Sequence, residues 1–125
     1  MLKKRQCQRF NVTGTTLHYQ KNPLLWGKGK FSHDYYPVLD ISRGGLKFLS
    51  NHKIPAGSRL TLRINFPGLD HPKEIKAVVR WVSRNREASY RYQNGVSFNP
   101  YGTGRQENLV ELLNFLKSLE SKYLM

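Results

Sequence analysis

Short segments of alternating apolar and polar residues, separated by turn residues, restrict this chain to a small set of folds. The clearest segment is RLTLRINF, in which alternation places four apolar side chains on one face of a strand: Leu60, Leu62, Ile64 and Phe66. Similar segments rich in Thr, Val, Ile, Tyr and Phe recur between residues 9 and 98, with Gly, Pro or Asn between them. About six short strands in one chain predict a small antiparallel barrel.

The C-terminal part of the chain has the period of a helix instead. Five leucines recur at the spacing of one helix face: Leu109, Leu112, Leu113, Leu116 and Leu119. Thr103 and, three residues later, Gln106 are typical of a capping box at a helix N-terminus. We therefore expect one amphipathic helix over residues 103–124, with its leucine face on the open side of a barrel formed by residues 10–100.

Net charge limits the kinds of partner this chain can have. The sequence contains 21 Lys and Arg against 8 Asp and Glu, a net charge of +13, and residues 1–33 hold seven basic side chains and no acidic one. A positive field attracts phosphate-bearing ligands, nucleic acid or an anionic membrane surface, and charge alone does not choose among them. No apolar segment is long enough to span a bilayer or to act as a secretory signal, so we expect a cytoplasmic protein of one domain without a transmembrane segment.

The residue types that usually perform catalysis or bind metals show no recognisable pattern. The spacing of a metal site is absent from the four histidines: His18, His33, His52 and His71. Cys7 is the single cysteine, so no set of cysteine ligands accompanies them. No Ser-His-Asp triad or carboxylate pair is recognisable in the sequence. We therefore expect no metal, no cofactor and no enzymatic activity.

A pair of arginines lies near the N-terminus. In the segment RQCQR, Arg5 and Arg9 are four residues apart, which in an extended chain is a separation of up to about 13 Å. At that distance the two guanidinium groups can bind separate parts of one ligand. Taken alone, such a pair is also typical of a solvated basic tail.

The segment DISRGG completes a strand and then turns the chain. Alternation places Val38, Asp40 and Ser42 on one face of that strand. Gly45 has no Cβ, so it permits a positive φ in the turn and a close approach of a ligand to the backbone. Taken alone, these residue types are also common in ordinary hairpin turns.

In combination, the two segments resemble the RxxxR and (D/N)xSxxG signature of the PilZ domain family, with every specified position filled by an expected residue. The segments VVRWV at 78–82 and NGVSF at 94–98 are also similar to the family. The resemblance implies a mainly β fold: a six-stranded antiparallel PilZ-type β-barrel with a C-terminal α-helix. It also implies a receptor for the bacterial second messenger cyclic di-GMP, with these ligand contacts: Arg5, Arg9, Asp40, Ser42 and Gly45.

The chemistry of these side chains suits that ligand. A guanidinium group of Arg5 or Arg9 can bind a phosphate or the paired O6 and N7 acceptors of guanine. Asp40 can accept hydrogen bonds from the guanine N–H donors, which favours guanine over adenine, and Ser42 can add a neutral hydrogen bond.

Four further residues are weaker candidates for ligand contacts: Lys4, Arg43, Gly44 and Trp81. In the family, a basic residue at the position of Lys4 is associated with two stacked ligands instead of one, and both stoichiometries stay open. Arg43 and Gly44 lie inside the second motif, where Arg43 offers a third cation. Trp81 either borders the ligand or belongs to the core.

These features favour a receptor in which residues 1–9 form a switch segment that moves onto the barrel when cyclic di-GMP binds and relays the signal to an unidentified protein partner. Two alternatives stay open. One is a nucleic-acid-binding barrel that uses its charge and a set of aromatic side chains that we expect to be exposed: Trp26, Tyr35, Tyr36, Tyr90 and Tyr92. The other is a PilZ-like protein adaptor that binds no nucleotide. The complete motif argues against the adaptor.

Overall fold

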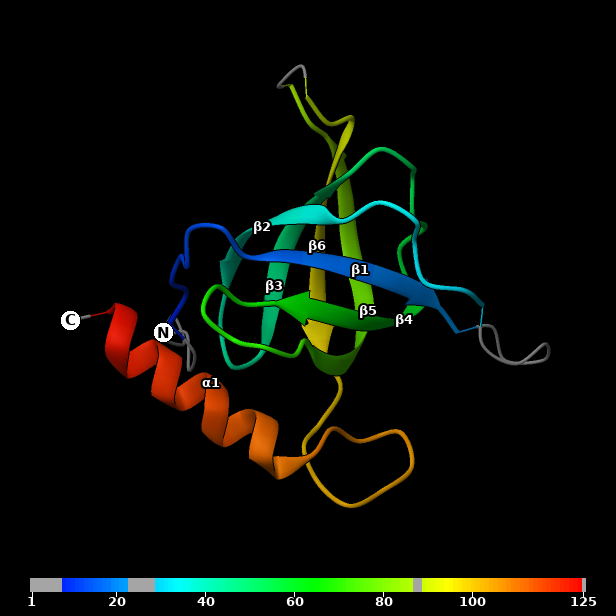
Figure 1. Ribbon diagram of the computed structural model, residues 1–125. Helices are drawn as coiled ribbons and strands as arrows, with labels where there is room; N and C mark the ends of the chain where they lie inside the picture. Colours follow the sequence, from blue (N-terminus) through cyan, green and yellow to red (C-terminus); the bar gives the residue numbers. More distant parts are fainter. Residues whose placement is uncertain (1–7, 23–28, 87–88, 125) are drawn as a thin grey trace, which may run out of the picture.

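A closed antiparallel barrel of six strands forms the body of the protein. Figure 1 shows the computed structural model, of which residues 8–22, 29–86 and 89–124 are described. The barrel order is β1-β2-β3-β6-β5-β4, and β1 pairs with β4 to close it. The elements are β1 Thr16–Lys21, β2 Tyr36–Ile41, β3 Gly45–Ser50, β4 Arg59–Asn65, β5 Lys73–Arg84, β6 Tyr92–Phe98 and α1 Val110–Tyr123. The predicted six-stranded barrel with a C-terminal helix is confirmed.

Inward-facing apolar side chains fill the barrel. The four residues that alternate along β4 and just beyond it are all buried, as predicted: Leu60, Leu62, Ile64 and Phe66. Leu17 of β1 and Leu46 and Phe48 of β3 are completely buried among them. Removal of this apolar surface from water is the main term that stabilises a barrel of this size.

Strand β2 contains an irregularity that changes which residues share a face. Val38 pairs with Phe48, but Asp40 pairs with Lys47, so the register shifts by one residue between them. Val38 consequently packs against the core, whereas Asp40 lies on the outer face. The predicted common face for Val38 and Asp40 is therefore wrong, because the bulge interrupts the alternation.

The C-terminal helix starts later than predicted. It begins at Val110, after an N-cap at Leu109 that makes no side-chain capping bond, so the helix expected from residue 103 and its capping box are wrong. The reason is Asn108, whose buried side chain accepts from the Lys76 N–H at 2.7 Å and donates to the Lys76 carbonyl at 3.0 Å. These bonds tie the chain to β5 and keep it irregular up to the helix start.

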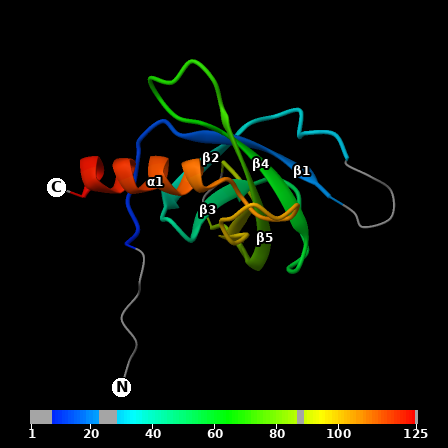
Figure 2. The same ribbon diagram turned by 90° about the horizontal axis from the view of Figure 1, so that it is seen from below.

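Helix α1 packs across one end of the barrel, beside the segment that precedes β1 (Figures 1 and 2). Leu116 is buried. The ring of Phe115 packs edge-on against the ring of Phe66, with 5.1 Å between the two ring centroids. Leu109 is 65% exposed, so its predicted place on the buried leucine face of the helix is wrong. Phe115 was not predicted, because the predicted face consisted of leucines alone.

The described residues contain no helix with the length and hydropathy needed to cross a bilayer.

Candidate ligand-binding site

The segment before β1 lies against the end of β2. Phe10 and Ile41 exchange two backbone hydrogen bonds, each N–H donating to the other's carbonyl at 2.9 Å. The Asn11 side chain donates a further bond to the Leu39 carbonyl at 2.7 Å. Phe10 is itself buried in the core, so this attachment is both polar and apolar. It brings the preceding residue, Arg9, to the outer face of β2.

Arg9 and Asp40 form an ion pair at this point. The Arg9 Nη1 donates to Asp40 Oδ1 at 2.6 Å, and Lys47 Nζ lies 3.5 Å from Asp40 Oδ2. The Arg9 and Asp40 side chains are 39% and 22% exposed, so the pair can be reached by a ligand from solvent. The structure therefore joins one arginine of the first motif to the carboxylate of the second. Lys4 and Arg5 lie outside the described residues.

A cavity of about 270 Å³ adjoins this ion pair. Five of the residues expected at the site line it: Arg9, Ser42, Gly44, Gly45 and Trp81. The other lining residues come from β5 and β6: Arg80, Gly95, Val96 and Ser97. Asp40 does not line the cavity itself and is connected to it through its bond to Arg9.

Ser42 and Gly45 shape the β2–β3 turn. The Ser42 N–H donates to the Gly45 carbonyl at 2.8 Å, and the Ser42 hydroxyl accepts from the Gly44 N–H at 3.2 Å. The hydroxyl of this buried serine is thus engaged inside the turn, which orders the backbone at the cavity wall.

Gly45 is required for a reason other than the predicted one. Its φ is not positive, so the expected left-handed turn conformation is wrong. A Cβ at Gly45 would instead overlap the carbonyl oxygen of Val96 on the neighbouring strand β6. The absence of a side chain permits close contact between β3 and β6, and only indirectly a close approach of ligand.

Trp81 lies on the surface of the barrel, outside the core. It is 41% exposed, and its indole covers Gly95, where a Cβ would overlap the ring. The register of β5 shifts between Val79 and Trp81, so Arg80 and Trp81 are both exposed. Of the two alternatives left open by the sequence, the structure places Trp81 at the cavity.

Arg80 and Ser97 are site residues that the sequence did not indicate. The Arg80 Nε donates to Ser97 Oγ at 2.6 Å, and both residues line the cavity. Both lie in segments already noted for their family resemblance, which was the available signal. Simple alternation would have placed Arg80 and Trp81 on opposite faces, because it cannot detect the bulge between them.

Arg43 is oriented toward α1 and does not line the cavity. Its Nε donates to Glu120 Oε1 at 3.0 Å and its Nη2 to Glu120 Oε2 at 3.2 Å. The Tyr101 hydroxyl donates to the Arg43 carbonyl at 2.6 Å. The predicted third cation of the site thus connects the β2–β3 turn to the helix.

The aromatic side chains expected to be exposed differ in their environments. Tyr35 is 63% exposed, whereas Tyr36 is buried, so the expected exposure of Tyr36 is wrong. Tyr90 and Tyr92 are half-buried, and Trp26 lies outside the described residues. None of the four described tyrosines lines the cavity beside the Arg9–Asp40 pair.

The site combines cationic donors, one carboxylate and one exposed indole. Guanidinium groups suit phosphate and the acceptor edge of guanine, while a carboxylate suits N–H donors. An indole offers a flat surface on which a base can stack. Within residues 8–22, 29–86 and 89–124, no cluster of three or more His, Cys, Asp or Glu side chains is arranged to bind a metal ion.

Comparisons with known proteins identify the family and the fold. The PilZ domain matches residues 3–115. Among solved structures, MrkH from K. pneumonia in complex with c-di-GMP matches with a TM-score of 0.64 at 14% identity, covering 97% of this chain and 52% of MrkH. The inhibitor of motility MotI/DgrA from Bacillus subtilis matches with a TM-score of 0.58 at 21% identity, covering 97% and 53% of the two chains. The PilZ domain of YcgR from Escherichia coli with c-di-GMP matches with a TM-score of 0.57 at 13% identity, covering 96% and 97%.

The fold and the site define a small β-barrel module with an arginine-lined cavity beside the β2–β3 turn. The chain belongs to the PilZ domain family, since the family match covers most of its length. The structural neighbours show the same fold at low identity, and the chain spans about half the length of MrkH and of MotI/DgrA. No curated protein sequence matches it.

Proposed function

We propose that this chain is a cyclic di-GMP receptor that binds its ligand at the cavity beside the β2–β3 turn. The observation that carries the proposal is the 2.6 Å contact between Arg9 and Asp40, which brings the two halves of the PilZ signature to one place. Membership of the PilZ family and the c-di-GMP complexes of MrkH and YcgR support it.

Each side chain has a distinct role in this proposal. Arg9 binds the O6 and N7 edge of guanine or a phosphate, and Asp40 accepts hydrogen bonds from the guanine N–H donors. The ligand competes with the Arg9–Asp40 ion pair, and each partner exchanges one hydrogen bond for another. Trp81 provides a stacking surface and Arg80 a further cation. Lys4 and Arg5 add cations from the segment before Arg9, and one or two ligands can be accommodated by this chemistry.

The ligand extends beyond the cavity onto the exposed surface around it. A volume of about 270 Å³ suits one base and an adjoining phosphate better than a complete cyclic dinucleotide. The second half of the ligand therefore lies toward residues 1–9, which close over it and so act as the switch segment.

The signal then passes to a protein partner, and the protein acts in the cytoplasm without catalysing a reaction. Two contacts support a route from the ligand to the rest of the surface. The Phe10–Ile41 bridge attaches the residue that follows the switch segment to β2, and the Arg43–Glu120 pair joins the motif turn to α1.

Calorimetric titration with three nucleotides tests the proposal. Cyclic di-GMP should bind with a defined stoichiometry of one or two. Cyclic di-AMP should bind at least about tenfold more weakly, since its adenine edges leave donors or acceptors of the site unpaired. GTP should also bind at least about tenfold more weakly, since it offers one guanine where cyclic di-GMP offers two. Equal binding of all three would indicate a general anion site and contradict the proposal. Salt-sensitive binding of single-stranded DNA with no preference for cyclic di-GMP would favour the nucleic-acid alternative.

A further inference from the structure

A second cavity, of about 430 Å³, lies at the opposite end of the β2–β3 hairpin from the cyclic di-GMP site. Tyr36 at the start of β2 and His52 just beyond β3 both line it, whereas Ser42 and Gly45 line the first cavity. Six-residue strands are about 17–20 Å long, so the two cavities are separated by roughly that distance. None of the signature residues that the structure describes lines this second cavity.

The wall of this cavity is firmly attached to β1. The Ser32 N–H donates to the Tyr19 carbonyl at 2.7 Å, and the Tyr19 N–H donates to the Ser32 hydroxyl at 3.1 Å. The Gln20 side chain donates to the Gly29 carbonyl at 2.6 Å. These bonds fix residues 29–34 as one side of the cavity, so the cavity exists before any ligand binds.

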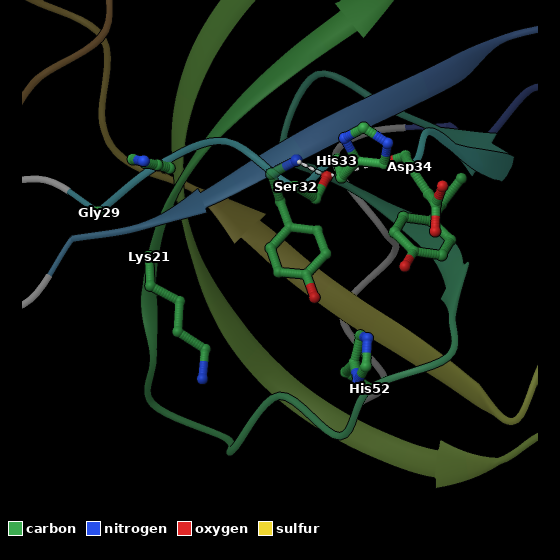
Figure 3. Close-up of a pocket in the computed structure, with 9 residues that line it drawn as sticks. Lys21, Gly29, Ser32, His33, Asp34 and His52 are labelled. Carbon is green, nitrogen blue, oxygen red and sulfur yellow. Dashed lines mark hydrogen bonds between the residues drawn. The ribbon is translucent and has the colours of Figure 1, made fainter.

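Hydrogen-bond donors and cations dominate the lining. Lys21, Lys30 and His52 line the cavity against a single carboxylate, that of Asp34. In the part of the chain that the structure describes, neither Lys21 nor Lys30 forms an ion pair. Figure 3 shows the side chains of Lys21 and His52 on facing walls, from β1 and from the segment after β3.

Two tyrosine hydroxyls add neutral donors. Burial raises the pKa of Tyr19 and of Tyr36, and the charge of Asp34 raises that of Tyr36 further. Both hydroxyls therefore keep their protons at neutral pH. Their rings also give the cavity an apolar surface next to the cationic groups.

We propose that this cavity binds a small phosphomonoester, of the size of a sugar phosphate or a mononucleotide. Two lysine ammonium groups balance the charge of a phosphate dianion, and the tyrosine hydroxyls and His52 supply donors for its three terminal oxygens. A cavity of about 430 Å³ exceeds the size of inorganic phosphate and leaves room for an organic group against the tyrosine rings. Asp34 is then available to accept from a hydroxyl or amino group of that part of the ligand.

The test compares phosphorylated and neutral probes on matched variants. Ribose 5-phosphate and AMP, with ribose and adenosine as their neutral counterparts, are titrated into the full chain and followed by NMR chemical shifts and calorimetry. The double variant K21Q/K30Q removes both cavity lysines. The control K53Q/K117Q removes the same charge at two exposed lysines that do not line the cavity.

We expect ribose 5-phosphate or AMP to bind the wild type and the control equally, and to bind K21Q/K30Q at least about tenfold more weakly, since charge-assisted bonds to phosphate are lost. Ribose and adenosine should not bind measurably to the wild type or to either double variant. Saturating cyclic di-GMP should not displace the phosphomonoester. Unchanged binding to K21Q/K30Q, equal binding of the neutral probes or displacement by cyclic di-GMP would overturn the proposal. Binding of single-stranded oligonucleotides, with no measurable binding of ribose 5-phosphate or AMP, would also overturn it.

A conservative variant separates a role in binding from a role in folding. Tyr19→Phe removes only a hydroxyl, so the fold should persist while the affinity for the same phosphomonoester falls severalfold. An unchanged affinity in Tyr19→Phe together with an unchanged affinity in K21Q/K30Q would place the probe elsewhere on the molecule.

Discussion

The guanidinium of Arg9 lies 2.6 Å from the carboxylate of Asp40, although the two residues are 31 positions apart in the sequence. This contact requires the segment before β1 to lie against β2, where the Phe10–Ile41 bridge fixes it. Because the pair is partly exposed, it adds little to the stability of the barrel. Substitution of either residue should therefore affect ligand binding more than folding.

In the proposed receptor, the ligand should protect the switch segment, residues 1–9, from hydrogen exchange. We expect backbone amides of residues 3–9 to exchange hydrogen more slowly in the presence of saturating cyclic di-GMP, because phosphates neutralise the neighbouring cations and bind them. The measurement is hydrogen exchange followed by mass spectrometry, with Asp40→Ala as the comparison. Protection of the same size in Asp40→Ala would contradict a switch that closes over this site.

Gly45 and Gly95 should tolerate a methyl group differently. Gly45→Ala places a Cβ against the Val96 carbonyl, so it should lower the free energy of unfolding by about 1–3 kcal/mol. Gly95→Ala places a Cβ against the Trp81 indole, and its cost should disappear in the Trp81→Ala background. Urea unfolding of the single and double variants measures both effects. A Gly45→Ala cost that also disappears with Trp81→Ala would show that the backbone contact is not its cause.

The ion pair between Arg43 and Glu120 should stabilise the docking of α1. Both side chains are less than one third exposed and share two hydrogen bonds. A double-mutant cycle of Arg43→Ala and Glu120→Ala should give a coupling energy of about 0.5–1.5 kcal/mol in urea unfolding. The matched cycle of Arg43→Ala with Glu111→Ala, at the other end of the helix, should give none. Equal coupling in the two cycles would argue against a specific contact.

Stability should decline at alkaline pH because of Tyr19. Burial raises the pKa of Tyr19 above its usual value of 10.0 in the folded state. Above pH 10 the unfolded chain has lost this proton while the native state keeps it, so the free energy of unfolding falls as the pH rises. Below that value both states are protonated and the residue has no effect on the pH dependence. Tyr19→Phe should have a shallower decline above about pH 10 in urea unfolding, and an identical decline would contradict the assignment.

Alternation along the chain predicted the core because it is a local property of each strand. Leu60, Leu62 and Ile64 required no knowledge of the neighbouring strands to be assigned inward, and all are buried. The same reasoning failed where a strand bulges. The register shifts at Val38/Asp40 and at Val79/Trp81 depend on pairing with β3 and β6, which local periodicity does not contain.

The site was predicted in part for a similar reason. Motif residues such as Arg9 and Ser42 could be selected by their resemblance to the PilZ signature, and they line one cavity. Arg80 could not, because its exposure follows from the bulge in β5. The late helix start was also hidden, since it depends on bonds from Asn108 to a strand more than thirty positions away.

The most direct test of the receptor assignment is calorimetric titration of cyclic di-GMP into the wild type, Arg9→Ala, Asp40→Ala and Arg84→Ala. Arg84 is an exposed arginine at the end of β5 that does not line the cavity, so its variant controls for the loss of charge. We expect Arg9→Ala and Asp40→Ala each to weaken binding by about 10- to 150-fold, the equivalent of one charge-assisted hydrogen bond. Arg84→Ala should bind like the wild type. Wild-type affinity in both Arg9→Ala and Asp40→Ala would contradict the account.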